Sequence, residues 1–383
     1  MHRTEHTIDR RDFLCTTAAV VGSVALPSCH SSTSEPPLDP TAQVAAVRGT
    51  NLYDMTREVL EGLGGIEQVV HDGESVFIKP NMVTLPWANT MDRFRAGELT
   101  KPEIVMVVAE ECLKAGAREV VIGDGSHLYT FDWSYATTLD GSTNLVEEAA
   151  RLSAAYGRTV RVACLEDESP GWVDIPTGAS VGSIAVSSLV TNADRVISIP
   201  VAKTHSWAQL TLALKNFVGV TSLERHAGWT GSSWDRGTSF DHDTPGAIAE
   251  IYLDVVAGVK PDLAVIDFSI GIEGDGPTTG HGGQPVDIRN RLGSWLLLAS
   301  TDLVAADATA ARIMSHDIPS IVQLEMAYEM GLGEMREGAI QLVGERLSDL
   351  EMSWEPAELR ARPAPEEGTL AHGQGCPLSS RLV

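Results

Sequence analysis

The chain has 383 residues, and its hydrophobic fraction of 43% is enough for a full globular core. Its 52 acidic and 28 basic side chains give a formal net charge of −24, which argues against nucleic acid or an anionic membrane surface as a partner, because both require a positive field. The five cysteines form no C-x-x-C pair, so no cysteine-ligated iron–sulfur cluster or structural zinc is expected, whereas a metal ion on other ligands stays possible.

Residues 1–29 have the features of a Tat-type export signal. Arg10 and Arg11 precede an uncharged apolar run that is too short to span a bilayer. Cys29 ends the segment LPSC and is a candidate lipidation site, although ordinary signal cleavage near this point fits almost as well. We therefore expect an exported, periplasmic or extracytoplasmic protein that contacts the membrane only through a possible lipid anchor. The Ser- and Pro-rich residues 30–42 are typical of a flexible linker.

Apolar runs of strand length alternate with helical patterns over residues 43–345. The predicted strands are 43–49, 75–81, 119–126, 158–165, 195–205, 262–274 and 295–302. The predicted helices are 52–64, 102–116, 144–157, a segment after residue 205 that ends near 218, 244–258 and 303–314. This alternation predicts the α/β class, with a mostly parallel sheet flanked by helices, in one large domain or two intimately joined lobes.

The remaining segments are irregular. Residues 127–142 and 224–243 are predicted to form long polar loops, which in a compact protein are more often functional lids than spacers. Residues 346–383, rich in Pro, Ala and Glu toward their end, are predicted to form a C-terminal tail.

Polar side chains follow the predicted strands. In an open parallel sheet, ligands bind beyond the carboxyl ends of the strands, where neighbouring loops meet. Lysine is rare here, with six residues among 28 cations, yet Lys79 and Lys203 both lie at strand ends, which favours a binding cleft over solvated loops. The candidate ligand-binding residues are Lys79, Asn81, Asp124, Ser126, Thr204, Asn216, Gly274, Gly276 and Asp302.

Residues 196–220 carry Lys203, His205 and Lys215 without an acidic residue among them. We predict that these three are the catalytic residues of a local cationic pocket for a small anionic ligand, with His205 as an acid–base group or a metal ligand. Lys215 belongs to this pocket if it lies on a helix that follows His205, although a lysine reaching solvent from a buried helix is the alternative. Asp267 and Glu273 would orient the cations or bind a metal ion.

Three further motifs leave alternatives open. The glycine-dense loop 271–283 could direct backbone N–H groups at an anion, or could be a flexible turn. GASVG at 178–182 matches G-x-S-x-G, but its context lacks the strand and helix that a nucleophile elbow needs. Asp241-His242-Asp243, with His226 and His281, could bind a metal, although an acid-rich lid fits the spacing better.

The ordered set IKPN, GDGS, IPVAKTH, LALKNFVGV, DFSIGIEGDGP and STDLVAAD, between residues 44 and 315, resembles the family known as domain of unknown function 362. The resemblance implies little about activity. Many relatives carry an appended ferredoxin-like segment with two cysteine-rich cluster motifs, and this chain lacks those cysteines. A weaker similarity to the N-terminal half of nickel-pincer lactate racemase-like proteins would imply that IPVAKTH and LALKN hold an organic nickel nucleotide.

Three interpretations of function follow. The protein could be an exported enzyme or cofactor-bearing protein with an anion in its cleft, a non-catalytic binding lipoprotein that captures a ligand for delivery, or a partner subunit of a redox complex. The identity of any cofactor and the oligomeric state are not indicated by the sequence.

Overall fold

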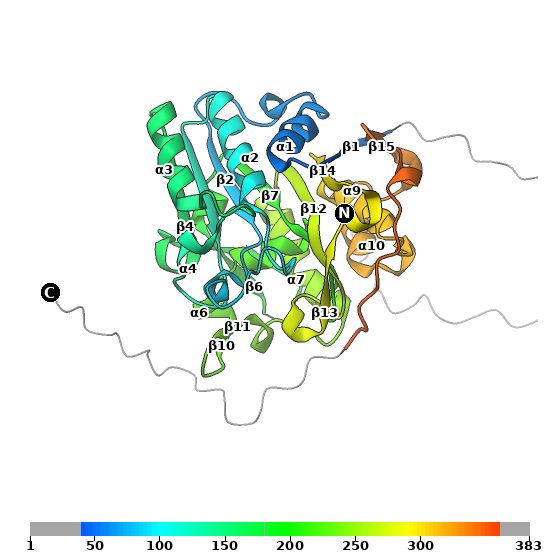
Figure 1. The fold of residues 1–383 in the computed structure, drawn as a ribbon. Helices are drawn as coiled ribbons and strands as arrows, with labels where there is room; N and C mark the ends of the chain where they lie inside the picture. The colour runs from blue at the N-terminus through cyan, green and yellow to red at the C-terminus, as the bar shows by residue number, and fades with distance from the viewer. Residues whose placement is uncertain (1–39, 180, 361–383) are drawn as a thin grey trace, which may run out of the picture. The chain divides into compact units, whose positions relative to one another are not determined.

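The structure is a computed structural model that describes residues 40–179 and 181–360 (Figure 1). The predicted export signal, Cys29 and nearly all of the predicted linker lie outside the described residues, so export and lipidation stay predictions. The described residues belong to one unit by their contacts. In this part of the chain, no helix has the length and apolar character needed to cross a membrane.

Eleven strands of the described chain form one sheet. Eight of them have the order β15-β1-β14-β12-β7-β2-β3-β4, β8 and β13 also pair with β12, and β9 pairs with β8. The strands are β1 (Ala42–Gly49), β2 (Ser75–Pro80), β3 (Glu119–Asp124), β4 (Thr159–Cys164), β7 (Arg195–Ile199), β8 (Val201–His205), β9 (Gln209–Thr211), β12 (Leu263–Gly274), β13 (Gly283–Asp287), β14 (Trp295–Ser300) and β15 (Ile340–Val343). The run from β12 to β4 is parallel throughout, which confirms the predicted α/β class.

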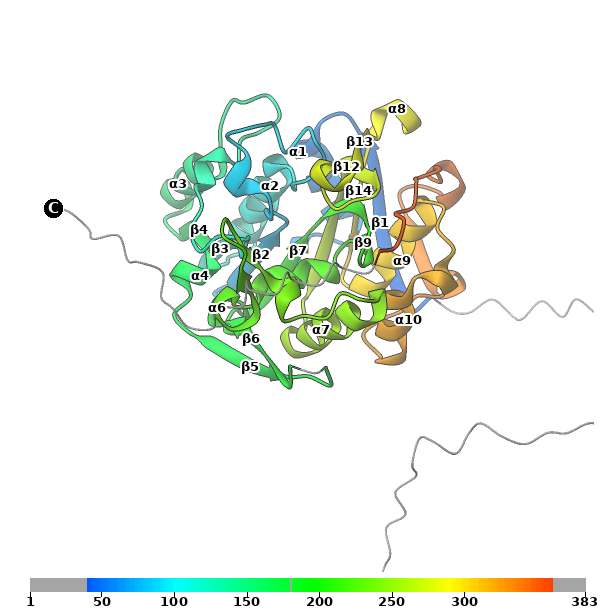
Figure 2. The same cartoon turned by 90° about the horizontal axis from the view of Figure 1, so that it is seen from below.

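Helices cover both faces of the sheet (Figure 2). The helices α1 (Leu52–Glu61), α2 (Pro102–Lys114) and α3 (Leu145–Tyr156) cover one face, whereas α7 (Pro245–Val259), α9 (Leu303–Ile313) and α10 (Val322–Glu329) cover the other. Alternate strand residues enter the two cores: in β1, Val44 and Ala46 pack on one side and Ala45 and Val47 on the other. The sheet is therefore buried on both faces, as its continuous apolar strands require.

The helix ends follow their sequence signals. Thr244 caps α7 by accepting a hydrogen bond from the N–H of Ala247 at 3.2 Å, and Pro245 occupies the first turn. Pro102 likewise opens α2. These local signals place the helices within a few residues of their predicted ends.

Two predicted elements between residues 195 and 218 are wrong. The strand is interrupted at Pro200, which cannot donate a backbone hydrogen bond, so that β7 and β8 are separate strands. The predicted helix after His205 is instead a turn followed by β9, which pairs antiparallel with β8. Lys215 then opens a 3-10 helix, η4 (Lys215–Val220).

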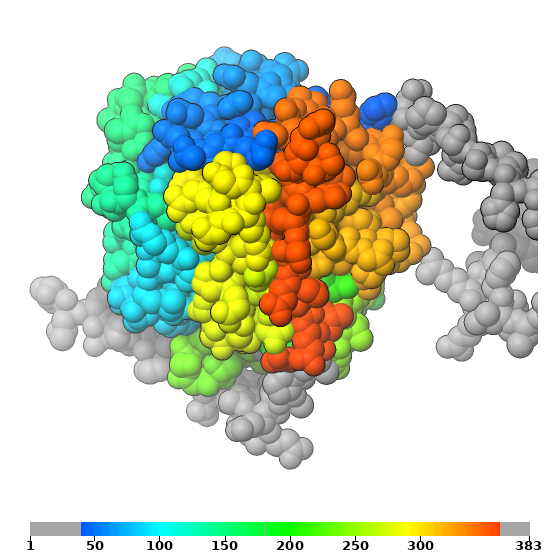
Figure 3. Space-filling model, turned by 45° about the vertical axis from the view of Figure 1, so that its right-hand side comes forward, coloured from blue at the N-terminus to red at the C-terminus, as the bar shows by residue number. Residues whose placement is uncertain are grey.

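The predicted tail is partly packed. Residues 350–360, here called the strap, run beside the β12–β13 segment (Figure 3), and Trp354 is only 3% exposed. The indole Nε1 of Trp354 donates to the Ile272 carbonyl at 2.9 Å, and the N–H of Gly274 donates to the Glu355 carbonyl at 2.8 Å. The N–H of Arg360 donates to the Ser206 carbonyl at 2.9 Å. The strap therefore ends beside His205.

Candidate functional site

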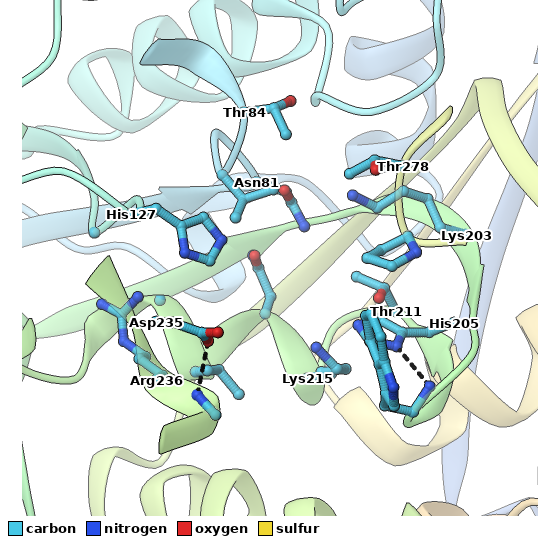
Figure 4. Close-up of a pocket in the computed structure, with 18 of the residues that line it drawn as sticks. Asn81, Thr84, His127, Lys203, His205, Thr211, Lys215, Asp235, Arg236 and Thr278 are labelled. Atoms are coloured by element: carbon cyan, nitrogen blue, oxygen red, sulfur yellow. Dashed lines mark hydrogen bonds between the residues drawn. The ribbon is translucent and has the colours of Figure 1, made fainter. Parts of the chain in front are cut away.

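A cavity of about 610 Å³ lies where β2, β3 and β8 end, and this volume is in the range of small-molecule sites (Figure 4). The structure brings seven of the predicted site residues together in its lining, although they come from segments far apart in the chain. These residues are Lys79, Asn81, Asp124, Lys203, His205, Lys215 and Asn216.

Lys79 has a structural role within this lining. Its ammonium forms an ion pair with Asp124 at 2.7 Å and donates to the Pro80 carbonyl at 2.8 Å and to Asn216 Oδ1 at 3.3 Å, so its three N–H groups are used. Burial lowers the pKa of Lys79, while the neighbouring Asp124 opposes that shift. Asn216 in turn donates to the Lys79 carbonyl at 2.8 Å. Lys79 thus fixes the position of η4, which carries Lys215.

Three other cations in the lining have no salt bridge to a carboxylate in residues 40–179 and 181–360. Lys203 donates to the Glu98 carbonyl at 2.9 Å, whereas Lys215 has no hydrogen bond within the described chain. Arg236 donates to neutral oxygens only, namely Thr221 Oγ1 at 2.9 Å, the Thr221 carbonyl at 2.8 Å and the Ser126 carbonyl at 3.0 Å. Cations removed from water without a negative partner are costly, which indicates a site for an anion.

The same burial perturbs the acid–base behaviour of the cations. Desolvation lowers the pKa of Lys203 to about 7. The nearby Glu98 carboxylate opposes that decrease, whereas Lys215 and Lys101 add to it. Desolvation also lowers the pKa of Lys215 to about 8, with a further contribution from Arg236. Both lysines are therefore partly neutral near neutral pH, and perturbed groups of this kind cluster at functional sites.

His205 has a different role from the expected acid–base group. Its Nδ1 accepts a hydrogen bond from the Trp207 N–H at 3.1 Å, and burial, together with the nearby Lys215, holds the pKa of His205 well below its usual value. The neutral ring must then carry its proton on Nε2, so that it can donate a hydrogen bond but has no lone pair left to act as a base. His205 is thus suited to polarise a bound oxygen, while proton acceptance falls to a lysine.

The cavity lining includes an aromatic cluster and several unpartnered polar atoms. The Trp207 ring contacts His205 and His281 edge-on, with centroids 5.6 and 5.1 Å apart. Trp207 Nε1, Thr211 Oγ1 and Asn81 Oδ1 are buried without a hydrogen-bond partner in the structure. Such atoms are rare in folded proteins, and a bound ligand would satisfy them.

Four predicted ligand-binding residues serve the fold near the cavity instead of lining it. Ser126 Oγ donates to the Val83 carbonyl at 2.6 Å, and Thr204 Oγ1 donates to the Gly274 carbonyl at 2.7 Å. The Gly276 carbonyl accepts from the Ser206 N–H at 3.1 Å. The bonds to Gly274 and Gly276 hold the loop after β12, whose Thr278 and His281 do line the cavity.

The carboxylates predicted further along the chain do not reach the cavity, so those predictions need correction. Asp302 caps α9 by accepting from the Ala305 N–H at 2.9 Å, and it follows β14, which is antiparallel to β12 and therefore ends at the opposite edge of the sheet. Asp267 is paired with Lys101 at 3.4 Å, and Glu273 with Arg291 at 2.6 Å. Both acids are used within the fold, which does not fit the metal-binding role.

The remaining candidate metal-binding and hydrolase motifs do not form such sites in the described chain. His226 Nε2 accepts from the Ala185 N–H at 2.8 Å. Among the described residues, no group of three or more His, Cys, Asp and Glu side chains is arranged to hold a metal ion. Residues 178–179 and 181–182 of GASVG lie between β5 (Trp172–Pro176) and β6 (Ser183–Ser187), which pair antiparallel, so the motif is followed by a strand and not by the helix that a serine-hydrolase elbow needs.

Arg236 and Trp207 line the cavity but are not among the candidates predicted from the sequence. Arg236 comes from the predicted lid 224–243, which also supplies Asp235 and His242 to the lining. The length and polarity of that loop favoured a functional role for the loop, but they did not indicate which of its residues would line a site. Of the other predicted lid, 127–142, His127 lines the cavity.

Asp307 holds the backbone just before Lys215, and its burial predicts how the free energy of unfolding depends on pH. Its carboxylate accepts from the Ala213 N–H at 2.8 Å and the Leu214 N–H at 3.0 Å, directly before Lys215, and burial raises the pKa of Asp307 to about 7. The folded protein then binds a proton that the unfolded chain has lost, so this group lowers the free energy of unfolding as the pH rises from about 4 to about 7, by an amount on the order of a few kcal/mol. Urea unfolding across this pH range should give a shallower decline for Asp307→Asn than for the wild type. Parallel pH profiles would contradict the prediction.

Comparison with known proteins gives a family and a similar sequence from a cyanobacterium. The family described as "Domain of unknown function (DUF362)" matches residues 76–312. A thylakoid-associated protein of Synechocystis is 25% identical over 282 residues, which cover 74% of this chain and 76% of that protein.

Two solved structures show only remote similarity. The lactate racemase apoprotein from Thermoanaerobacterium thermosaccharolyticum is 12% identical with a TM-score of 0.38, over 73% of this chain and 58% of that chain. A protein from Thermotoga maritima is 13% identical with a TM-score of 0.38, over 74% of this chain and 60% of that chain. The present chain thus spans about three fifths of the solved chains that it matches.

Proposed function

The chain belongs to the DUF362 family, and we propose that this member binds a small anionic molecule in the cavity formed by Lys203, Lys215 and Arg236. The observation that carries the proposal is that three buried cations of one cavity form no salt bridge with a carboxylate of the described residues, in a protein whose net charge is −24. An anion in the cavity would supply the missing negative charge.

The lining also has groups suited to proton transfer. Lys203 and Lys215, whose pKa values are lowered to about 7 and about 8, can each accept a proton near neutral pH. The Nε2–H of His205 can donate a hydrogen bond to an oxygen on which negative charge develops. Of the functions considered, an enzyme that moves a proton on an anionic substrate uses the largest number of these features.

Isothermal titration calorimetry with inorganic phosphate tests anion binding. Replacing Lys215 by Gln should weaken phosphate binding about 10- to 100-fold, because one charge-assisted hydrogen bond is lost. Lys114→Gln is the matched control, since Lys114 is a partly exposed lysine paired with Glu111 on α2. Phosphate affinity that is equal in the two variants would reject the proposal.

A second substitution separates the enzyme from a protein that only binds its ligand. His205→Gln should keep phosphate affinity within about 3-fold, because the neutral ring contributes no charge to binding. If a substrate is turned over, the same substitution should lower kcat more than it raises KM, since the hydrogen bond strengthens as charge develops. Unchanged turnover in His205→Gln would exclude this role for the histidine.

A further inference from the structure

The unpaired cations of the cavity are separated in space. Arg236 is anchored to Thr221 and Ser126, whereas Lys203 is anchored to the Glu98 carbonyl. In Figure 4 these two side chains lie on opposite sides of the cavity, with Lys215 between them. The pKa of Lys215 is lowered by burial and by Arg236, while Lys215 in turn contributes to the lowered pKa of Lys203, which fits the same order.

The charges of the lining do not balance. Among the described residues, four basic side chains line the cavity (Lys79, Lys203, Lys215 and Arg236) and two acidic ones do (Asp124 and Asp235), so the lining has an excess of two positive charges when Lys203 and Lys215 are protonated. Lys79 is neutralised by Asp124. A single monoanion at one end would leave the cation at the other end buried and uncompensated, which is unfavourable.

Uncharged polar atoms also line the cavity, beside the cations. Thr211 Oγ1, Trp207 Nε1 and Asn81 Oδ1 are among the buried lining atoms without a hydrogen-bond partner in the described chain, and they include both a donor and an acceptor. They suit the body of a ligand that carries hydroxyl or carbonyl groups between its charged ends. The volume of about 610 Å³ accommodates a small molecule of this kind.

From these observations, and resting on the proposed anion-binding function, we propose that the ligand is a small molecule with two separated acid groups, one held by Arg236 and the other by Lys203, with Lys215 between them. Two chemical classes share this arrangement, namely dicarboxylates and phosphorylated carboxylates. The cavity thereby distinguishes them from monocarboxylates, which can neutralise only one end.

A ligand series on the wild-type protein tests the proposal without any substitution. Calorimetry at constant ionic strength would compare acetate and lactate with malonate, succinate, glutarate and adipate, and with 3-phosphoglycerate. The best dianion should bind at least ~10-fold more tightly than either monocarboxylate, because a second charge-assisted contact forms. Among the dicarboxylates, affinity should pass through a maximum with chain length. Whichever of succinate and 3-phosphoglycerate binds more tightly would show whether the ligand is a dicarboxylate or a phosphorylated carboxylate.

Lys203→Gln and Arg236→Gln provide the second arm, after circular dichroism has shown that each variant is folded. In either variant the preference for succinate over acetate should fall below ~3-fold, since one end has lost its cation, and in the control Lys114→Gln it should persist. Monocarboxylates that bind as tightly as dianions, or affinity that does not depend on chain length, would overturn the inference while leaving anion binding intact. Failure of every anion to bind would overturn both.

Discussion

Asp124→Ala is expected to lower the free energy of unfolding by about 3–5 kcal/mol, because it leaves the buried ammonium of Lys79 without its negative partner. The two side chains are 1% and 2% exposed, and their charged atoms are 2.7 Å apart. The second oxygen of Asp124 also accepts from the Met82 N–H at 2.6 Å. Urea unfolding measures the loss, and weaker phosphate binding should accompany it, because Lys79 holds Asn216 and thereby Lys215.

Two controls separate the buried pair from ordinary surface charge. Lys114→Gln removes ion pairs of a lysine that is 45% exposed and should cost less than about 1 kcal/mol. The double variant Lys79→Met/Asp124→Leu should be less destabilised than Asp124→Ala alone, since neither charge is then buried unpaired. If Asp124→Ala unfolds at the urea concentration of the wild type, the ion pair does not stabilise this edge of the sheet.

Gly276→Ala should be the most damaging small substitution in the loop that closes the cavity. A Cβ atom at this position would overlap the Thr204 carbonyl oxygen and lie 3.2 Å from Ile272 Cγ2. Because the Ser206 N–H donates to the Gly276 carbonyl, the loop cannot move away without breaking that bond. We expect a loss of about 3 kcal/mol in the free energy of unfolding, together with weaker phosphate binding as Thr278 and His281 are displaced.

Gly280→Ala is the matched control in the same loop. A Cβ atom at position 280 would meet only Thr278 Oγ1, at 3.6 Å, which is an ordinary contact. Its free energy of unfolding should stay within about 0.5 kcal/mol of the wild type. Equal losses in the two variants would show that the close approach to Thr204 is not what makes Gly276 necessary.

Local sequence patterns predicted most of the central strands and helices, and they predicted several residues that the structure brings together in the cavity lining. Apolar runs that end in a polar residue located β2, β3 and β8, and the parallel direction of β2 and β3 brought Lys79 and Asp124 to one edge. Pro200 also carried a readable signal, since proline is disfavoured within a strand. Lys215 reached the predicted pocket even though β9 and a 3-10 helix, not an α-helix, deliver it.

The direction of a strand in the sheet, in contrast, depends on which strands from other parts of the chain it pairs with, and its own residues do not indicate that direction. β14 is as apolar as the parallel strands of the sheet, yet it runs antiparallel to both of its neighbours, β1 and β12, and carries Asp302 to the far edge. Arg236 was not predicted as a site residue, because a long loop has no periodicity that shows which of its side chains points inward. Asp267 was misassigned because its partner Lys101 lies 166 residues earlier in the chain.

The pairing of β1 constrains how the chain can fold during translation. β1 is parallel to β15 and antiparallel to β14, and both partners are made much later than β1 itself. Until Val343 has emerged from the ribosome, β1 cannot form backbone hydrogen bonds with strands on both of its sides. In a nascent chain that ends before Trp295, β1 has neither of these partners, so its backbone N–H and C=O groups are expected to stay unpaired and open to chaperones that recognise extended apolar segments.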